Sequence, residues 1–477
     1  MSQEYDAIEG VLTHHKGLLR AAIDCQSAYL TLAAVLQDQT CRSVLADQLP
    51  AAADVQTRWR LMQIRLEDGK DTLKDACSDG GPLDTCTSML AAMQAIFSQF
   101  GQLYATMRLT CPRLNLVSDA EILLAIAFGH TPADVSSSLL KACFPGVSSL
   151  VAKAPARATD AAVTITAVRG LQRDCIILEA PVTAGLLPLH EWLAHLEVLL
   201  KSSLRSHTKA CLESPPELDP VHLSTPYPKQ AVMLVDGVLH VRAVEDALTK
   251  LAKGSDRQAV RQLADETCAH LEALAERMVC SMREQSSTAA SDPDGHLRPT
   301  SFNSCALEVL LLSTQAHRDT AEQLLREGVA AVSDWTWLRT VRHYWLEEAH
   351  DCHVCVGDAC LSYGWEYSGG SYCQETMLLV HSDRAMMAAV SALQHSCVLA
   401  LSPVSDSTGL PLNAAAGALA GALGYLLVHV DCVGGLGHLE IVRLLQVRCS
   451  PQANRYLLGL WSDCGPGFLV HHIVIAR

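Results

Sequence analysis

The chain has 477 residues, too many for one compact core, so we expect roughly two or three domains. A composition of 49% hydrophobic and 18% charged residues excludes collagen-like, mucin-like and disordered proteins. With 36 Lys and Arg against 51 Asp and Glu, the formal net charge of −15 disfavours direct binding to nucleic acid, anionic lipid and other polyanions.

The chain contains 19 cysteines, which in a short secreted protein would suggest disulfides. Residues 1–18 do not form an apolar signal segment, because Glu4, Asp6, Glu9 and Lys16 interrupt them. We therefore expect a cytosolic protein whose cysteines are reduced thiols.

Residues 18–281 follow a mostly helical pattern. One helix is expected to begin at Ser118, whose side chain can cap the free backbone amides while Glu121 reaches back to it. In residues 260–282, apolar side chains recur at helical spacing and acidic side chains fill the other faces. This pattern is typical of a long amphipathic helix packed on other helices.

Breaks in the helical pattern fall at residues 151–160, 213–228 and 284–303, where Pro, Gly, Ser or Asp gather. The last two breaks are expected to be surface loops. Between them, apolar residues on both sides of Asp236-Gly237 predict a small β-hairpin over residues 231–241.

After about residue 351 the pattern changes to short strands separated by helices and Gly-rich turns, which indicates an α/β unit. Strands are predicted at residues 352–356, 377–380, 397–401 and 426–430. Residues 414–430 are long enough to be a marginal membrane span, but their glycines favour a buried helix followed by a buried strand. We expect the sheet of this unit to expose an unpaired edge.

Two groups of residues suggest a metal site, and neither has the required geometry. His190 and His195 are five residues apart, whereas two zinc ligands on one helical face need a spacing of four. Cys352 and Cys355 would point to opposite faces of a strand. We predict no metal site and no catalytic residue, and interpret the cluster of Cys352, His353, Cys355 and Cys360 as small buried side chains.

Residues 399–425 have the order of a phosphate-binding loop: strand, small-residue loop, Ala-rich helix, strand. Such a loop needs a Lys to pair with the phosphate oxygens and a Ser or Thr hydroxyl for Mg²⁺. No Lys follows Lys253 anywhere in the chain. Asp406 adds negative charge, and Pro411 removes a backbone donor. These observations predict a retained fold and a lost nucleotide site.

Several motifs occur in the same order as in the dynein heavy chain family. Together they resemble the C-terminal part of its linker and the start of its first AAA+ module. They are Gln48-Leu49-Pro50 with Trp59, residues 111–123, 143–147 and 227–232, His317-Arg318-Asp319, residues 335–345 and 363–369, Leu379-Val380 and Asp383-Arg384.

The chain departs from the family in the nucleotide pocket. In the register of the family motif "GPAGTGKTET", Leu412 replaces the lysine, Asn413 the hydroxyl residue and Pro411 a loop glycine. The degenerate loop thus comprises Asp406, Gly409, Pro411, Leu412 and Asn413. A register shifted by about three residues, which Asp383-Arg384 suggests, also lacks the lysine.

The resemblance implies a mainly α fold: a multi-helix dynein-type linker rod followed by a truncated α/β P-loop AAA+ domain. The implied domains are a linker over residues 1–350, a partial first AAA+ module over 351–446 and a divergent tail over 447–477. The family uses ATP and Mg²⁺, but we expect no cofactor and no enzyme activity for this chain.

By resemblance, the function is a structural or assembly role in axonemal dynein-type complexes, as in divergent dynein-like proteins tied to assembly of sperm flagella. One alternative is the N-terminal portion of an active ATP-dependent, minus-end-directed microtubule motor whose other AAA+ modules hydrolyse ATP. Another is a helical scaffold unrelated to dynein, which predicts no α/β portion after about residue 351.

The implied partners are other dynein heavy-chain modules and, through the full-length complex, dynein intermediate and light intermediate chains. We expect no direct contact of this chain with microtubules, nucleic acid or membranes. The implied location is the cytoplasm and cytoskeleton, including the axoneme of a cilium or flagellum.

Overall fold

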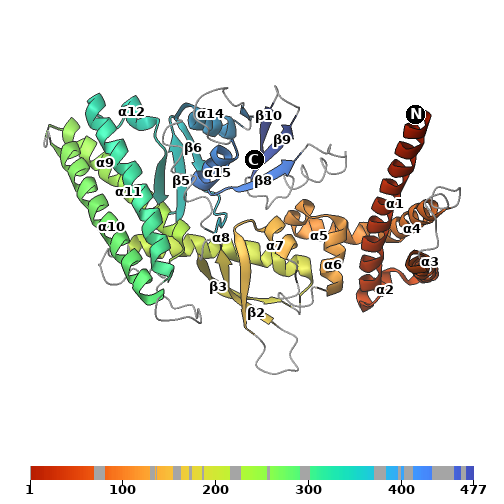
Figure 1. Ribbon diagram of the computed structural model, residues 1–477. Coiled ribbons are helices and arrows are strands. Elements are labelled where there is room, and N and C mark those ends of the chain that lie inside the picture. Colours follow the sequence, from red (N-terminus) through yellow and green to blue (C-terminus); the bar gives the residue numbers. More distant parts are fainter. Residues whose placement is uncertain are drawn as a thin grey trace. The chain divides into compact units, whose positions relative to one another are not determined.

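The computed structural model describes residues 2–68, 81–128, 135, 137–153, 163–170, 174–184, 187–214, 227–254, 258–289, 301–369, 383–395, 399–401, 412–431, 456–463 and 469–476. The chain divides into two compact units (Figure 1). The first comprises residues 1–139, 161–163 and 184–193, and the second comprises the remainder.

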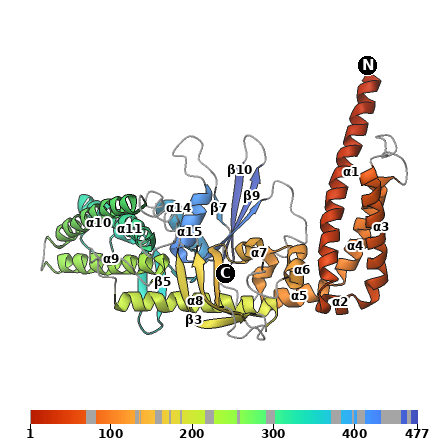
Figure 2. The ribbon, with the colours of Figure 1, turned by 60° about the horizontal axis from the view of Figure 1, so that its bottom comes forward.

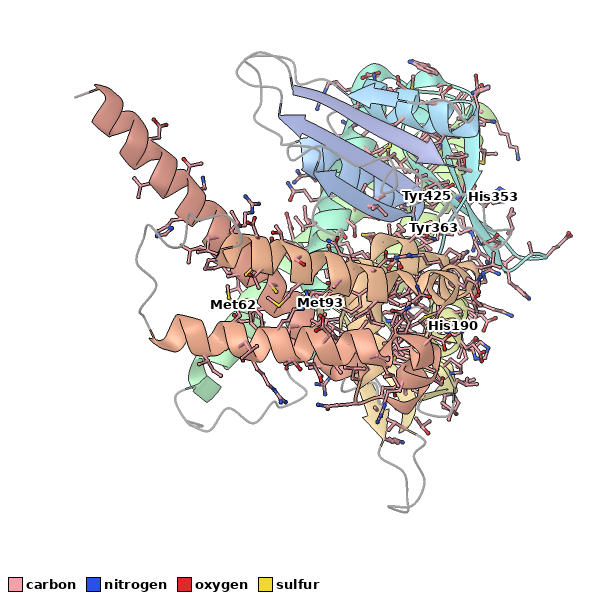
Figure 3. All side chains as sticks on the ribbon, turned by 90° about the vertical axis from the view of Figure 1, so that its right-hand side faces the viewer. Met62, Met93, His190, His353, Tyr363 and Tyr425 are labelled. Atoms are coloured by element: carbon pink, nitrogen blue, oxygen red, sulfur yellow. A yellow bond between two sulfur atoms is a disulfide. The ribbon has the colours of Figure 1, made fainter. Side chains whose placement is uncertain are left out.

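The first unit is a helical bundle in which α1 packs on α4 and α6, and α3 packs on α4. Its core is rich in sulfur: Cys25, Met62, Met89 and Met93 are all buried, and Figure 3 shows Met62 and Met93 between their helices. The helices are α1 (Ser2–Val35), α2 (Gln39–Val44), α3 (Leu49–Asp68), α4 (Pro82–Ser98), α5 (Gly101–Thr110) and α6 (Asp119–Phe128), with 3-10 turns at Ala46–Gln48 and Pro112–Leu116.

The predicted capping box at the start of α6 is confirmed. The backbone N–H of Glu121 donates to Ser118 Oγ at 3.3 Å, and the backbone N–H of Ser118 donates to Glu121 Oε2 at 3.4 Å. Arg108 of α5 also contacts the start of α6. Its guanidinium pairs with Asp119 at 2.7 Å and donates to the carbonyl of Val117 at 3.0 Å. These contacts fix the turn between α5 and α6.

The second unit begins with a sheet in the order β1-β2-β3, formed by Val147–Lys153, Val163–Gly170 and Cys175–Ala184. Strand β1 pairs antiparallel with β2. The sequence pattern did not predict this sheet, because only β2 carries a run of β-branched residues and many side chains of β1 and β3 are exposed.

Helices α9, α10 and α11 pack on one another (Figure 2). The helices of this unit are α7 (Ser137–Cys143) and α8 (Leu189–Glu213), which both begin in the first unit, α9 (Lys229–Ala252), α10 (Ala259–Ala289), α11 (Ser301–Glu327) and the short α12 (Trp335–Leu338).

The β-hairpin predicted at Asp236-Gly237 is wrong, because α9 runs unbroken through both residues. Apolar side chains of α9, including Val241, Val244 and Leu248, are buried against its neighbours. Burial of this stripe outweighs the cost of a helical glycine, which is about 1 kcal/mol. Gly237 also admits the ring of His343, since an added Cβ would lie 3.2 Å from His343 Nδ1.

Residues beyond 340 form two further sheets. Strands β4 (Arg342–Leu346), β5 (Asp351–Val356) and β6 (Ala359–Ser362) make an antiparallel meander, which confirms the strand predicted at residues 352–356. The strand predicted at residues 377–380 lies outside the described residues. The remaining elements are α14 (Asp383–Gln394), β7 (Leu399–Leu401), α15 (Leu412–Leu423), β8 (Leu426–Asp431), β9 (Tyr456–Asp463) and β10 (Leu469–Ala476).

The last sheet has the order β7-β10-β9-β8. Strand β10 is antiparallel to both β7 and β9, and β9 is parallel to β8. Strands β7 and β8 therefore run in the same direction, as the predicted strand–helix–strand order requires. The two inner strands come from the segment expected to be a divergent tail. Strands β7 and β8 are the outer strands of the described sheet, each paired on one side only.

The structure is mostly helical with small sheets, in agreement with the mainly α expectation. A helical scaffold without strands after residue 351 is contradicted by β5 to β10. Within the ranges given above, no helix combines the length and the apolar character that crossing a membrane requires.

Candidate functional site

The segment Tyr363–Gly369 joins three parts of the second unit. It follows β6 without regular secondary structure, and its aromatic residues Tyr363, Trp365 and Tyr367 are all at least 96% buried. Trp365 has a φ of 58°, in the left-handed region that a bulky residue rarely adopts. Such a conformation persists only where the surroundings hold it in place. We call Tyr363–Gly369 the joint segment.

Gln230, in the first turn of α9, holds the joint segment by its side-chain amide. Its Nε2 donates to Tyr363 Oη at 2.8 Å and to the Glu366 carbonyl at 2.7 Å. Its Oε1 accepts from the Ser368 backbone N–H at 3.0 Å and from the Ser368 hydroxyl at 3.2 Å. The buried amide therefore has all four of its hydrogen-bonding positions occupied. Gln230 thereby fixes the start of α9 to the segment.

Asp174, just before β3, is a second buried anchor. One carboxylate oxygen accepts from the Lys229 backbone N–H at 3.1 Å, and the other accepts from the Tyr367 hydroxyl at 3.0 Å. Burial raises the pKa of Asp174, while the bonds from Lys229 and Tyr367 and the Lys229 charge oppose that rise. Asp174 therefore links the β1–β3 sheet to α9 and to the joint segment.

The glycines around the joint segment permit an unusually close backbone approach. A Cβ on Gly170 would lie 2.5 Å from Tyr367 Oη, and one on Gly146 would lie 2.6 Å from the Ser368 carbonyl carbon. On the other side, a Cβ on Gly364 would lie 2.5 Å from the Gly424 oxygen. Any side chain at these positions would force the layers apart.

The joint segment also binds the turn between α15 and β8. The backbone N–H of Gly364 donates to the Leu423 carbonyl, and that of Glu366 donates to the Gly424 carbonyl, both at 2.9 Å. Gly424 has a φ of 63°, as expected for a glycine that ends a helix. Figure 3 shows Tyr363 and Tyr425 side by side at this turn. One short segment therefore connects α9, the β1–β3 sheet and the α15–β8 turn.

A cavity of about 150 Å³ lies beside the joint segment, between α9, α11, β4 and the end of α15. Three histidines line it. His240 and His317 stack with their ring centroids 3.8 Å apart and their planes 3° apart, and His343 Nε2 donates to the Ala422 carbonyl at 3.2 Å. Asp236 lies beside them: its carboxylate accepts from Ser313 and is 3.6 Å from His317 Nδ1.

Burial is the main cause of the pKa shifts in this group. It lowers the pKa of His317 to about 3, with further lowering by the charges of His343 and His270. It lowers the pKa of His240 well below 6.5, and also lowers the pKa of His343. Burial raises the pKa of Asp236. The histidine rings are therefore neutral at pH 7.

Of the residues predicted for the degenerate loop, Asp406, Gly409 and Pro411 lie outside the described residues. Leu412 and Asn413 are the first residues of α15, and their side chains are not described. The helix therefore begins at two residues that were predicted to belong to the loop, and the loop chemistry stays a prediction.

His190 and His195 lie on α8, where the core stripe predicted for Trp192, Leu193, Leu196 and Leu200 is confirmed by their burial. In the described part of the chain, no group of three metal-ligating side chains is close enough to hold an ion.

Cys355 and Cys360 correct the expectation that every cysteine is a free thiol. They are direct partners in the β5–β6 register, with Cα atoms 4.2 Å apart, and are joined by a disulfide. The two-residue turn that begins at Gly357 (φ 60°) sets this register. Cys352 stays a buried free thiol, as predicted, but His353 and Cys355 are half-buried and Cys360 is exposed, so burial of the whole cluster was wrong.

The sequence motifs pointed to Gln230 only through the resemblance at residues 227–232. No sequence pattern marked Asp174 or His240 as a site residue, because a single buried polar residue does not form a periodic pattern. His317 and His343 stood within motifs but had no assigned role.

Comparison with known proteins finds similarity to dynein heavy chains. Residues 1–211 match the dynein heavy chain, N-terminal region 2. The chain is 23% identical over 322 residues to cytoplasmic dynein 2 heavy chain 1 of Rattus norvegicus, which covers 67% of this chain and 7% of that protein. It is 21% identical over 375 residues to dynein axonemal heavy chain 1 of Homo sapiens, covering 77% and 8%.

A third relative, dynein axonemal heavy chain 2 of Mus musculus, is 20% identical over 433 residues, covering 90% of this chain and 9% of that protein. The chain therefore spans less than a tenth of the length of these three relatives. The family match over residues 1–211 and the relatives agree with the ordered motifs: in this region the chain is similar to dynein heavy chains.

Proposed function

We propose that this chain is a dynein-type linker joined to a first AAA+ module that does not bind ATP, with a structural or assembly role in axonemal dynein-type complexes of the sperm flagellum or cilium. The partners proposed are other heavy-chain modules and the intermediate and light intermediate chains. The location proposed is the axoneme, since two of the relatives above are named as axonemal heavy chains.

The residue at the start of α15 carries this proposal. The helix begins at Leu412, where the family has the lysine that meets the phosphates, and Asn413 follows in place of the Mg²⁺-binding hydroxyl. A leucine cannot neutralise the charge of a triphosphate, and the chain has no lysine after Lys253 that could replace it.

The joint segment supports the structural part of the proposal. It is hydrogen-bonded to both α9 and the α15–β8 turn. These bonds oppose movement of α9 relative to that turn. A nucleotide can shift a conformational equilibrium only if it binds two states differently. A module that does not bind ATP would therefore brace the linker without driving it.

Calorimetric titration of the purified chain with ATP and Mg²⁺ tests the loss of binding. We expect no saturable binding at millimolar ATP, and a micromolar Kd would contradict the proposal. The double substitution Leu412→Lys with Asn413→Thr should strengthen ATP binding by about tenfold or more, since it restores charge-assisted contacts. Leu239→Lys, at an exposed position of α9, is the matched control and should bind no better than the parent chain.

The proposed location needs a separate test. An antibody against the chain should label axonemes of sperm or ciliated cells, and detergent extraction of the membrane and cytosol should leave the labelled chain with the axonemal pellet. Its complete release with the cytosol would contradict an axonemal role.

An active motor is a second candidate, favoured by the length of the relatives. The matched region covers only 7% to 9% of each of the three, so the rest of such a protein could hold hydrolysing modules. ATPase and microtubule-gliding assays on the product isolated from its native cells would separate the candidates. ATP-dependent gliding favours the motor, and its absence from an intact preparation favours the structural role.

A further inference from the structure

The histidine-lined cavity is formed by elements that are distant in the sequence. Its walls come from α9, α11, α12, β4, α14 and the end of α15, together with Tyr363 of the joint segment. At about 150 Å³ it matches the size of an apolar protein cavity known to accept benzene. A molecule of one or two small rings is therefore the size of ligand to consider.

The cavity walls suit a flat ring. His240 and His317 are stacked, and the ring of Trp337 meets His240 edge-on at 6.4 Å between centroids. Two methionines, Met233 and Met386, add flexible and polarisable side chains that adapt to an irregular ligand. Aromatic faces of this kind favour offset or edge-on contacts with another ring.

The wall of the cavity includes a buried nitrogen of His240. His240 Nε2 is buried and makes no hydrogen bond within the described part of the chain. Leaving a buried polar group unsatisfied costs about 1–3 kcal/mol, so the unpaired nitrogen calls for a partner in the cavity. In contrast, His343 Nε2 is already bonded to Ala422. His240 therefore supplies the specific contact of the site.

The charge of the surroundings favours an uncharged ligand. Asp236 is bonded to Ser313, and Arg339 is paired with Glu327 at 3.3 Å, so both charges beside the cavity are already engaged. The neutral histidines offer an anion no positive charge. A shared metal ion is also disfavoured, because the lone pairs of two parallel rings do not converge on one point.

We propose that this cavity is a binding site for a small uncharged heteroaromatic molecule whose ring nitrogen or N–H group pairs with His240 Nε2. The ligand would touch α9, α11 and the end of α15 at once. Binding would therefore stabilise the contact between the helical layer and the strand–helix–strand portion. The cavity is lined by Gly421 and Ala422 near the end of α15, whereas Leu412 and Asn413 are at its start.

The test compares benzimidazole with indene, which has the same shape and no nitrogen. Both are titrated into the whole chain and followed by ligand-observed NMR and by thermal unfolding. We expect benzimidazole to bind about fivefold more tightly than indene, which is the effect of one neutral hydrogen bond. Saturable binding of neither probe at millimolar concentration would mean that the cavity holds water only, and would overturn the proposal.

Two substitutions separate the polar contact from the cavity itself. His240→Phe keeps an aromatic ring and removes the nitrogen. This variant should therefore bind benzimidazole and indene with about equal affinity. An unchanged fivefold preference in this variant would overturn the assignment of His240 as the polar partner.

Ala316→Leu fills the cavity and should weaken both probes by about tenfold or more. Ala273→Leu, on an exposed face of α10, is its control and should leave both affinities unchanged. If Ala316→Leu does not fold by circular dichroism, the His240→Phe comparison alone decides. Equal weakening by Ala316→Leu and Ala273→Leu would place the binding elsewhere and contradict the site.

Discussion

His317 makes the stability of the second unit sensitive to acid. Its pKa is about 3 in the folded chain and about 6.5 for an unperturbed histidine, and burial is the main cause of the difference. Between these values the unfolded chain binds a proton at this residue and the folded chain does not. Stability is therefore fully present above pH 6.5 and falls as the pH decreases toward 3.

The magnitude follows from linkage. Each pH unit below 6.5 costs about 1.4 kcal/mol for one such histidine, so lowering the pH from about 7 to about 5 removes about 2 kcal/mol. The side chain keeps 17% of its surface accessible and lines the cavity, so water there reduces this value. His240 and His343 act in the same direction, whereas Asp236, with its raised pKa, opposes the loss at low pH.

Urea unfolding followed by tryptophan fluorescence at about pH 7 and about pH 5 measures this loss. His317→Phe should remove up to about 2 kcal/mol of the pH-dependent difference, because the ring stays and the proton site is gone. His195→Phe, at an exposed position of α8, is the control and should leave the difference unchanged. An equal pH dependence in the parent chain and His317→Phe would refute the reasoning.

Three further substitutions probe the joint and one helix start. Gln230→Leu removes four buried hydrogen bonds and should cost about 3–5 kcal/mol in urea unfolding, and a loss under about 1 kcal/mol would show that the segment is held by other contacts. Gly170→Ala should cost about 2 kcal/mol by overpacking against Tyr367, measured as a lower melting temperature, and an unchanged melting temperature would mean that the layers separate freely. Ser118→Ala should cost about 1 kcal/mol through loss of the cap of α6, and Ser118→Asp should restore it; equal stability of the two variants would contradict the capping role.

Features of the fold that depend on neighbouring residues could be predicted from the sequence. The capping box at Ser118 and the apolar stripe from Trp192 to Leu200 were correct, because both patterns repeat within one or two helical turns. The strand at residues 352–356 was also correct, because its alternating pattern likewise depends only on neighbouring residues. The hairpin at Asp236-Gly237 failed, because packing of α9 on its neighbours overrides a local turn signal.

The joint and the cavity depend on contacts between distant residues, and local patterns could not reveal them. Gln230 meets Tyr363 across 133 residues of sequence, and Asp174 meets Tyr367 across 193. Polar residues that pair over such separations leave no periodic trace. The absence of a lysine after Lys253 could be established from the sequence alone, since it requires no placement in space.

The glycines that contact the joint segment limit which substitutions the chain tolerates. Gly146 and Gly170 face the segment on one side and Gly424 on the other, and none of these positions has room for a methyl group. A substitution at any one of these glycines would therefore displace the joint segment and disturb its packing on both sides. Tolerated natural variation should consequently be rare at these glycines and common on the exposed surfaces of α1 and α10.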